Sequence, residues 1–180
     1  MSLNITSFTN RINELGLAKA NKYEVEISTG SGSIGKIVDQ DLTIMCETVS
    51  IKGKTLTTDL RRTYGLVRQV AYGINFEDLT LGFICTENLR EKKFFDAWVD
   101  YIYPTTSKTI NYDVKYYNEY TGTVTVHLLN DNLERVHKIE YKEAYPYQIS
   151  PLDLGYATNN SYLKLNVAFK YAWWQDTTIT

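Results

Sequence analysis

The sequence predicts a mainly β protein of one domain, with a single helix packed on its side. Its 180 residues are enough for one domain with a substantial core. Aromatic residues make up 13% of the chain and the 15 tyrosines exceed phenylalanine and tryptophan combined, which favours half-buried sheets and tyrosine-rich contact surfaces. Apolar and polar residues alternate with a period of two in several segments, which predicts strands, whereas one segment has a well-marked helical period. About seven strands and that helix predict an antiparallel sandwich or a partly closed barrel.

The N-terminal segment, residues 1–20, is predicted to be an arm that contains a short amphipathic helix. Its apolar face carries Phe8, Ile12 and Leu15, and the helix is expected to end near Gly16. The next segment, Tyr23–Ile27, alternates strictly and predicts a strand with two glutamates on one face. Paired carboxylates can perform acid/base chemistry where burial separates their pKa values. Because these two alternate with core positions, we interpret them as part of a solvated or interface face.

Residues 28–35 are rich in glycine and serine and predict a flexible hairpin tip, after which a strand resumes around Leu42, Ile44 and Cys46. From 48 to 73 the alternation weakens and the chain is basic, which predicts a long loop that contacts another chain. This segment has a local charge of +4, while residues 76–180 carry ten Lys/Arg against fourteen Asp/Glu. Charge complementarity between copies then makes its basic side chains candidates for contacts between subunits, with solvated loop charges as the alternative. These candidates are Lys52, Lys54, Arg61, Arg62 and Arg68.

A strand over residues 78–85 leads directly into the helical segment, residues 86–102. The packed face is predicted to carry Phe95, Trp98, Val99 and Ile102, and the wet face Asn88, Lys92, Asp96 and Asp100. Thr86 is the expected N-cap and Pro104 the stop signal.

The rest of the chain returns to strands. Residues 110–116 and 124–128 are predicted strands, with Thr123, Thr125 and His127 facing away from the core. A turn at 130–132 leads into a strand over 136–144. The prolines at 146 and 151 are expected to interrupt the hydrogen bonding between strands, because proline has no backbone N–H to donate. Residues 162–174 form the clearest strand, in which one face carries Leu163, Leu165, Val167, Phe169, Tyr171 and Trp173. We expect Phe83, Trp98, Phe169 and Tyr171 to pack together in the core.

No pattern in the sequence provides catalytic chemistry, so we predict a structural protein with no cofactor, no metal and no enzyme activity. His127 and His137 are the only histidines, and hairpin pairing could bring them together, but without a third ligand they are better interpreted as solvent-facing strand residues. Cys46 and Cys85 each fall on the apolar side of a segment that alternates like a strand, and they are expected to be buried free thiols. The formal charge of −2 favours neither nucleic acid nor a membrane, and no apolar run approaches the ~20 residues of a membrane helix.

The order of several short motifs resembles the tail tube proteins of contractile-tailed phages of the T-even type. The motifs run from Tyr-x-Val-x-Ile at 23–27 and the strand centred on Cys46, through Phe-Glu-Asp-Leu-Thr-Leu-Gly-Phe at 76–83 and Phe-x-x-Trp at 95–98, to Ala-Tyr-Pro at 144–146 and Phe-Lys-Tyr-Ala-Trp-Trp at 169–174. The resemblance covers roughly residues 20–175. The chain departs from the family at Lys52-Gly53, where members often have Pro-Gly, and at the hairpin extension over 30–35.

The resemblance implies two roughly orthogonal β-sheets with a flanking helix, hexameric rings, and stacking of the rings into a hollow tube inside a contractile sheath. It also implies the sheath, the baseplate or tube initiator and the tail terminator as partners, and DNA and the tape measure protein as cargo that passes without sequence-specific binding. The expected location is the virion tail, reached from the host cytoplasm during assembly. Tubes of type VI secretion and of extracellular contractile injection systems are related alternatives, as are the initiator and the terminator. Outside this class, a β-barrel that binds a small ligand is the other hypothesis.

Overall fold

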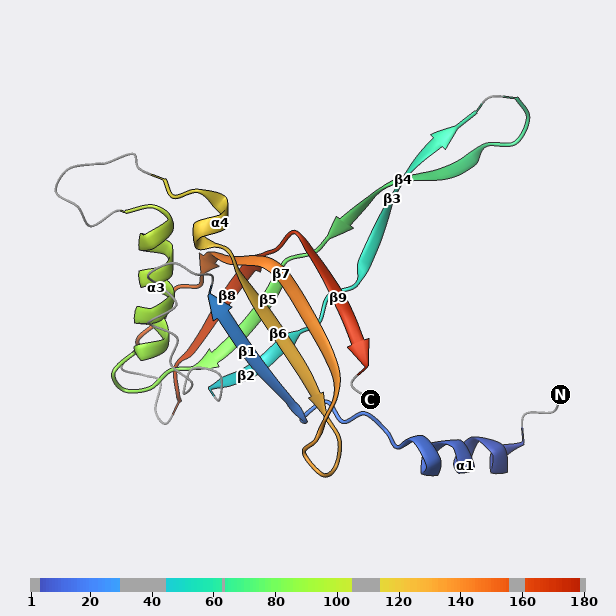
Figure 1. Ribbon diagram of the computed structural model, residues 1–180, viewed down its shortest axis with the longest axis horizontal. Helices are drawn as coiled ribbons and strands as arrows, with labels where there is room; N and C mark the ends of the chain where they lie inside the picture. The colour runs from blue at the N-terminus through green and yellow to red at the C-terminus, as the bar shows by residue number, and fades with distance from the viewer. Residues whose placement is uncertain (1–3, 30–44, 63, 105–113, 156–160, 179–180) are drawn as a thin grey trace.

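The computed structural model describes residues 4–29, 45–62, 64–104, 114–155 and 161–178. Its helices are α1 (Ile5–Leu15), α3 (Arg90–Ile102) and α4 (Tyr117–Tyr120). Its strands are β1 (Tyr23–Thr29), β2 (Cys46–Ser50), β3 (Lys54–Arg61), β4 (Arg68–Phe76), β5 (Leu79–Ile84), β6 (Gly122–Leu129), β7 (Arg135–Ile149), β8 (Lys164–Lys170) and β9 (Trp173–Thr178). Figure 1 shows α3 standing beside the sheets, while α1 and the β3–β4 ribbon project from the body.

Seven antiparallel strands form one continuous sheet that is divided by its longest strand, β7. The first part of β7 pairs with β6 and β9, and β6 pairs with β1, giving the strand order β1-β6-β7-β9 that we call sheet A. The last part of β7 pairs with β8, which continues to β5 and β2, and we call this sheet B. Between the two parts Glu143 has a φ of 55° and is skipped in the register with β6, and a second register shift follows between Pro146 and Gln148, so the strand bends from one sheet into the other. The mainly β prediction is confirmed, and the described strands do not close into a barrel.

The core lies between α3 and sheet B and continues under sheet A. Phe95 of the helix packs against Phe83 and Phe169, with ring centroids 5.1 and 5.9 Å apart. Trp98 is fully buried, lies 6.2 Å from the ring of Phe169, and donates its indole N–H to the carbonyl of Tyr120 at 2.9 Å. Tyr171 lies outside this group, because it is half-buried and packs on Tyr141 with a centroid distance of 5.0 Å.

Helix α3 begins four residues later than the sequence predicts, at Arg90, and Thr86 is not its N-cap. Thr86 instead donates its backbone N–H and its hydroxyl to one carboxylate oxygen of Glu91, at 3.0 and 3.1 Å. Glu91 is only 2% exposed, so this carboxylate ties the β5–α3 connection to the first turn of the helix. The packed face also includes Phe94, which the predicted spacing omitted.

Three other expectations about the chain need correction. Residues 48–73 are not a loop, because β3 and β4 pair within them as a two-stranded ribbon. The predicted strand over 110–116 lies partly outside the described residues. Its described end, residues 114–116, is not a strand but leads into α4, and Val114 and Tyr116 are exposed. The final strand is interrupted at 171–172, because β8 and β9 pair with different parts of β7, and Trp173 therefore faces outward while Trp174 packs against the core.

Other predicted elements agree with the structure. Helix α1 ends at Leu15 with Gly16 as its C-cap, and β1 and β5 occupy the predicted segments. The expected hairpin tip and the residues Leu42 and Ile44 lie outside the described residues. Cys46 and Cys85 are free thiols and half-buried, and burial raises the pKa of Cys46 to about 12.

Candidate assembly surfaces

Sheet A has two edges at which the backbone has no strand partner in the described part of the chain. One edge is β1, which pairs only with β6, and the other is β9, which pairs only with β7. All pairs are antiparallel, so β1 and β9 run in opposite directions. Such edges are templates for pairing with another chain.

The outer face of sheet A is polar, and its charged side chains are paired with one another. The guanidinium of Arg135 contacts Glu24 at 2.8 Å and Glu26 at 2.5 Å. Burial opposes ionisation of Glu26, but hydrogen bonds from His127 and Arg135 outweigh it and lower the pKa of this carboxyl. The two faces of the sheet therefore differ sharply, since Val25, Ile27 and their neighbours are buried on the inner side.

Glu140 occupies the centre of the same outer face. Lys138 contacts one of its carboxylate oxygens at 2.8 Å and Lys142 the other at 3.3 Å. Gln175 of β9 donates its amide N–H to Glu140 at 2.8 Å. The hydrogen bonds from Lys138 and Gln175, with a smaller contribution from Lys142, hold the pKa of Glu140 at about 2. This carboxylate thereby links the edge strand β9 to β7.

His127 faces away from the core side of β6 as predicted, but the prediction that it is solvent-facing is wrong, and His137 is half-buried. His127 is 4% exposed rather than solvent-facing, and its Nε2 lies 3.3 Å from Glu26. Its Nδ1 is buried without a hydrogen-bond partner among the described residues. In the β6–β7 register His137 stands opposite Leu128, the residue after His127. Because successive side chains of a strand point to alternate faces, His137 lies on the opposite face of the sheet from His127. Among the described residues, no three His, Cys, Asp or Glu side chains come together to hold a metal ion.

The five basic residues predicted to make contacts are divided between the base and the distal half of the ribbon. At the base, Lys52 lies 3.8 Å from Glu77, and the ammonium of Lys54 lies 4.1 Å from the ring centre of Trp174. Arg61, Arg62 and Arg68 are exposed in the distal half, and Arg61 stands directly opposite Arg68 across the strand pair. Like charges placed opposite each other destabilise a ribbon, so this pair favours an anionic partner.

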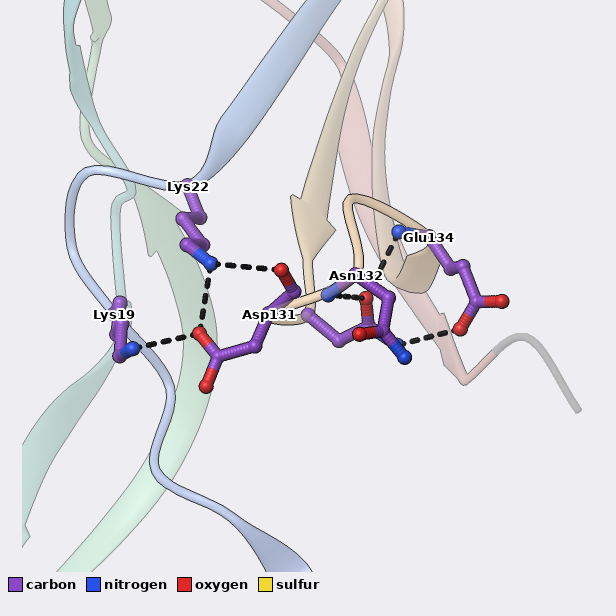
Figure 2. A network of polar contacts seen from close by, with 6 residues as sticks. Lys19, Lys22, Asp131, Asn132 and Glu134 are labelled. Carbon is purple, nitrogen blue, oxygen red and sulfur yellow. Dashed lines mark hydrogen bonds and ion pairs between the residues drawn. The ribbon is translucent and has the colours of Figure 1, made fainter.

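The N-terminal segment is attached to the β6–β7 turn by a cluster that the sequence did not reveal. Figure 2 shows Lys19 and Lys22 converging on Asp131, each with its ammonium 2.7 Å from the same carboxylate oxygen. These hydrogen bonds lower the pKa of Asp131 to about 2. Behind the cluster lies a pocket of about 450 Å³. It is lined by Gly16, Leu17, Ala18, Leu128, Leu129, Asn130, Asp131, Asn132, Val136 and His137.

The comparisons with known proteins identify the family. The model of the family described as phage tail tube protein matches residues 18–177, and the chain therefore belongs to the phage tail tube protein family. No curated protein sequence matches the chain. None of the helices in the described part of the chain has the length and apolar character needed to cross a membrane.

Solved structures of contractile injection machines have the same fold. A chain of the anti-feeding prophage baseplate superposes with a TM-score of 0.66 at 16% identity, covering 89% of this chain and 95% of that one. A chain of the sheath–tube complex of the extracellular contractile injection system PVC gives 0.64 at 16% identity, with coverage of 95% and 98%. A chain of the sheath/tube terminator of that system gives 0.63 at 15% identity, with coverage of 89% and 96%. The family is one of structural tube proteins, which agrees with the resemblance noted in the sequence.

Proposed function

We propose that this protein is the subunit of the inner tail tube of a contractile phage tail, and that six copies close into a ring. The observation that carries the proposal is that the oppositely directed edge strands of sheet A, β1 and β9, each have only one strand partner in the described part of the chain. Placing β9 of one copy beside β1 of the next continues the antiparallel alternation around the ring. Closure protects both edges of sheet A, which would otherwise promote aggregation.

Stacked rings then form a hollow tube inside the sheath. The family match and the fold shared with a chain of a sheath–tube complex support this arrangement. Its partners are further copies of the chain, the tail sheath protein, the baseplate or tube initiator and the tail terminator. The genome and the tape measure protein pass through the lumen without sequence-specific binding, and the subunits assemble in the host cytoplasm before residing in the virion tail.

The polar face of sheet A is the surface that fits the wall of the bore. A basic wall would bind phosphates and retard passage of DNA. The basic side chains of this face are matched by carboxylates, in the contacts Arg135 to Glu24 and Glu26, and Lys138 and Lys142 to Glu140. The wall is therefore close to neutral. Rings of unpaired Lys or Arg along the bore of an assembled tube would contradict this assignment.

The distal arginines of the ribbon supply contacts between subunits and between stacked rings. Charge complementarity of this kind sets register and partner choice more than raw affinity. The double variant Arg61→Glu with Arg62→Glu is expected to keep the circular dichroism spectrum of the folded monomer while losing tube growth. The matched variant Arg61→Lys with Arg62→Lys keeps the charge and should still grow tubes. Tubes at wild-type yield from the glutamate variant would show that the arginines are merely solvated.

Negative-stain microscopy and light scattering of the purified protein test the proposal as a whole. Rings or tubes that increase with protein concentration are expected. A strict monomer at every salt and protein concentration would refute the proposal.

The fold shared with extracellular contractile injection systems favours one second candidate, the tube of such a machine, to which the tube of type VI secretion is related. Particles isolated from cells that express this chain separate the candidates, because a phage tail is attached to a DNA-filled capsid. An initiator or terminator would be present in one ring per particle, whereas a tube subunit would be present in many.

A further inference from the structure

The β3–β4 ribbon has an apolar face that nothing covers in the described part of the chain. Leu56 and Leu60 lie on the same side of β3, and Ile74 stands directly opposite Leu56. All three are exposed, while Thr55 and Asp59 occupy the other side of the strand. An isolated two-stranded ribbon is marginally stable in water. A ribbon with one apolar face therefore requires a partner surface to remain ordered.

The tip of the ribbon is also apolar. Tyr64 is 98% exposed and Leu66 is 90% exposed, and they flank Gly65, whose φ of 81° allows the chain to reverse there. Large side chains held this far out are normally stabilised by contact with another surface.

The opposite end of the molecule has a pocket whose lining includes several apolar side chains. This pocket at the Asp131 cluster has a volume of about 450 Å³, and Leu128 and Leu129 contribute to its lining. Leu17 and Val136, which line it, are exposed. Because Lys19 and Lys22 hold the N-terminal segment against the β6–β7 turn, the pocket is preformed (Figure 2).

The β3–β4 ribbon and the β6–β7 turn lie at opposite ends of sheet A, as Figure 1 shows, and the residues of this turn line the pocket. The base of the ribbon is fixed where Lys54 meets Trp174 at the start of β9, whereas the pocket surrounds the end of β6. A tip at one end and a socket at the other cannot meet within one copy. A two-fold dimer would pair two tips with two sockets and stop there, whereas copies in stacked rings point the same way, so that each socket faces the tip of the next copy. Repeated head to tail, this contact stacks copies without closing.

We propose that the ribbon tip of one copy, through Tyr64 and Leu66, inserts into the pocket between the N-terminal segment and the β6–β7 turn of a second copy in the adjacent ring. The occupant is the same chain, because copies of it surround each subunit in the tube and carry both the tip and the socket. This inference rests on the proposed tube function. In this arrangement the contact between adjacent rings is chiefly apolar, and the distal arginines of the ribbon lie at its rim.

Cysteine cross-linking of assembled tubes tests the contact. In Leu66→Cys combined with Val136→Cys, mild oxidation is expected to produce a ladder of covalent multimers on a non-reducing gel, which collapses to monomer with reductant. Each single variant measures the background from the half-buried native thiols. The matched pair Leu66→Cys with Tyr116→Cys places the second thiol at the exposed N-cap of α4, which precedes β6, whereas the pocket lies at the far end of that strand, and this pair should give no ladder.

A non-covalent variant gives an independent readout. Leu66→Asp is expected to leave rings but lose tubes, whereas the control Leu66→Met should form both. Tubes that form without a ladder, a product that stops at the dimer, or an equal ladder from the Tyr116 control would overturn the contact and leave the tube function intact. Wild-type protein that forms neither rings nor tubes would overturn both. A tip that binds the sheath instead would give no ladder in tubes of this protein alone.

Discussion

Replacing Trp98 by alanine should be the most damaging single truncation in the core. The side chain is fully buried, so its removal leaves a cavity and costs about 3–5 kcal/mol. The substitution also removes two T-shaped ring contacts, to Phe94 at 5.9 Å and Phe169 at 6.2 Å. It also leaves the carbonyl of Tyr120 without the indole N–H that donates to it at 2.9 Å. These losses place the expected cost in the upper half of that range.

For a chain of this length, about 4–5 kcal/mol lowers the melting temperature by roughly 8–20 °C. Thermal unfolding followed by circular dichroism measures the shift, and urea titration gives the free energy of unfolding. Trp98→Phe retains an aromatic ring but loses the hydrogen bond and part of the buried ring volume, so its cost should be smaller than that of Trp98→Ala. Trp173→Ala is the matched control, since that indole is 44% exposed. Equal shifts for Trp98→Ala and Trp173→Ala would refute the packing argument.

Three further predictions concern the polar contacts and the close approach of strands. Glu91→Ala should lower the free energy of unfolding by about 2–3 kcal/mol, because it removes the buried acceptor of both Thr86 hydrogen bonds, and an unchanged urea midpoint would contradict this role. Gly122→Ala should cost about 1–3 kcal/mol, since a Cβ there would lie 2.3 Å from a backbone oxygen of β1, whereas Gly53→Ala meets nothing within 4 Å and should be neutral by the same titration. The pKa of Glu140 is about 2 in the folded protein and 4.5 in the unfolded chain, so its ionised carboxylate stabilises the fold above pH 4.5 and this contribution is lost as the pH falls toward 2. Glu140→Gln should therefore make the melting temperature depend less on pH between 4.5 and 2, and a pH dependence equal to that of the wild type would contradict this role.

The strands and the main helix could be predicted because their signals are local. Alternation in β1 and β5 and the helical spacing around Trp98 depend on neighbours within a few residues, and the structure places those elements in the predicted segments. The ribbon was missed for a physical reason. Its strands bury almost nothing within the monomer, and a bulge between Thr57 and Thr58 shifts the register of β3 against β4, so a pattern search for a buried face finds little there.

The burial of His127 and the Asp131 cluster could not be inferred from the sequence, because both depend on residues distant in the chain. His127 is covered by its position between β1 and β7 and by the long side chains of Glu26 and Arg135, which come from those two strands. Asp131 meets lysines more than a hundred positions away. A sequence pattern indicates which face of a strand is polar, but the packing of neighbouring strands determines whether the side chains of that face are exposed to solvent.

The division of β7 between two sheets gives the assembly surfaces a common support. Sheet B is anchored by the aromatic contacts of α3, whereas the edge strands of sheet A depend on single pairings to β6 and β7. Since β7 belongs to both, a core that holds its C-terminal part in place also fixes the direction of its N-terminal part, and with it the orientation of β9. Damage to the core should therefore weaken ring closure as well as folding. A truncation such as Trp98→Ala, studied at a temperature where the monomer is still folded, should raise the protein concentration needed for rings, while Trp173→Phe, which leaves the core intact, should not.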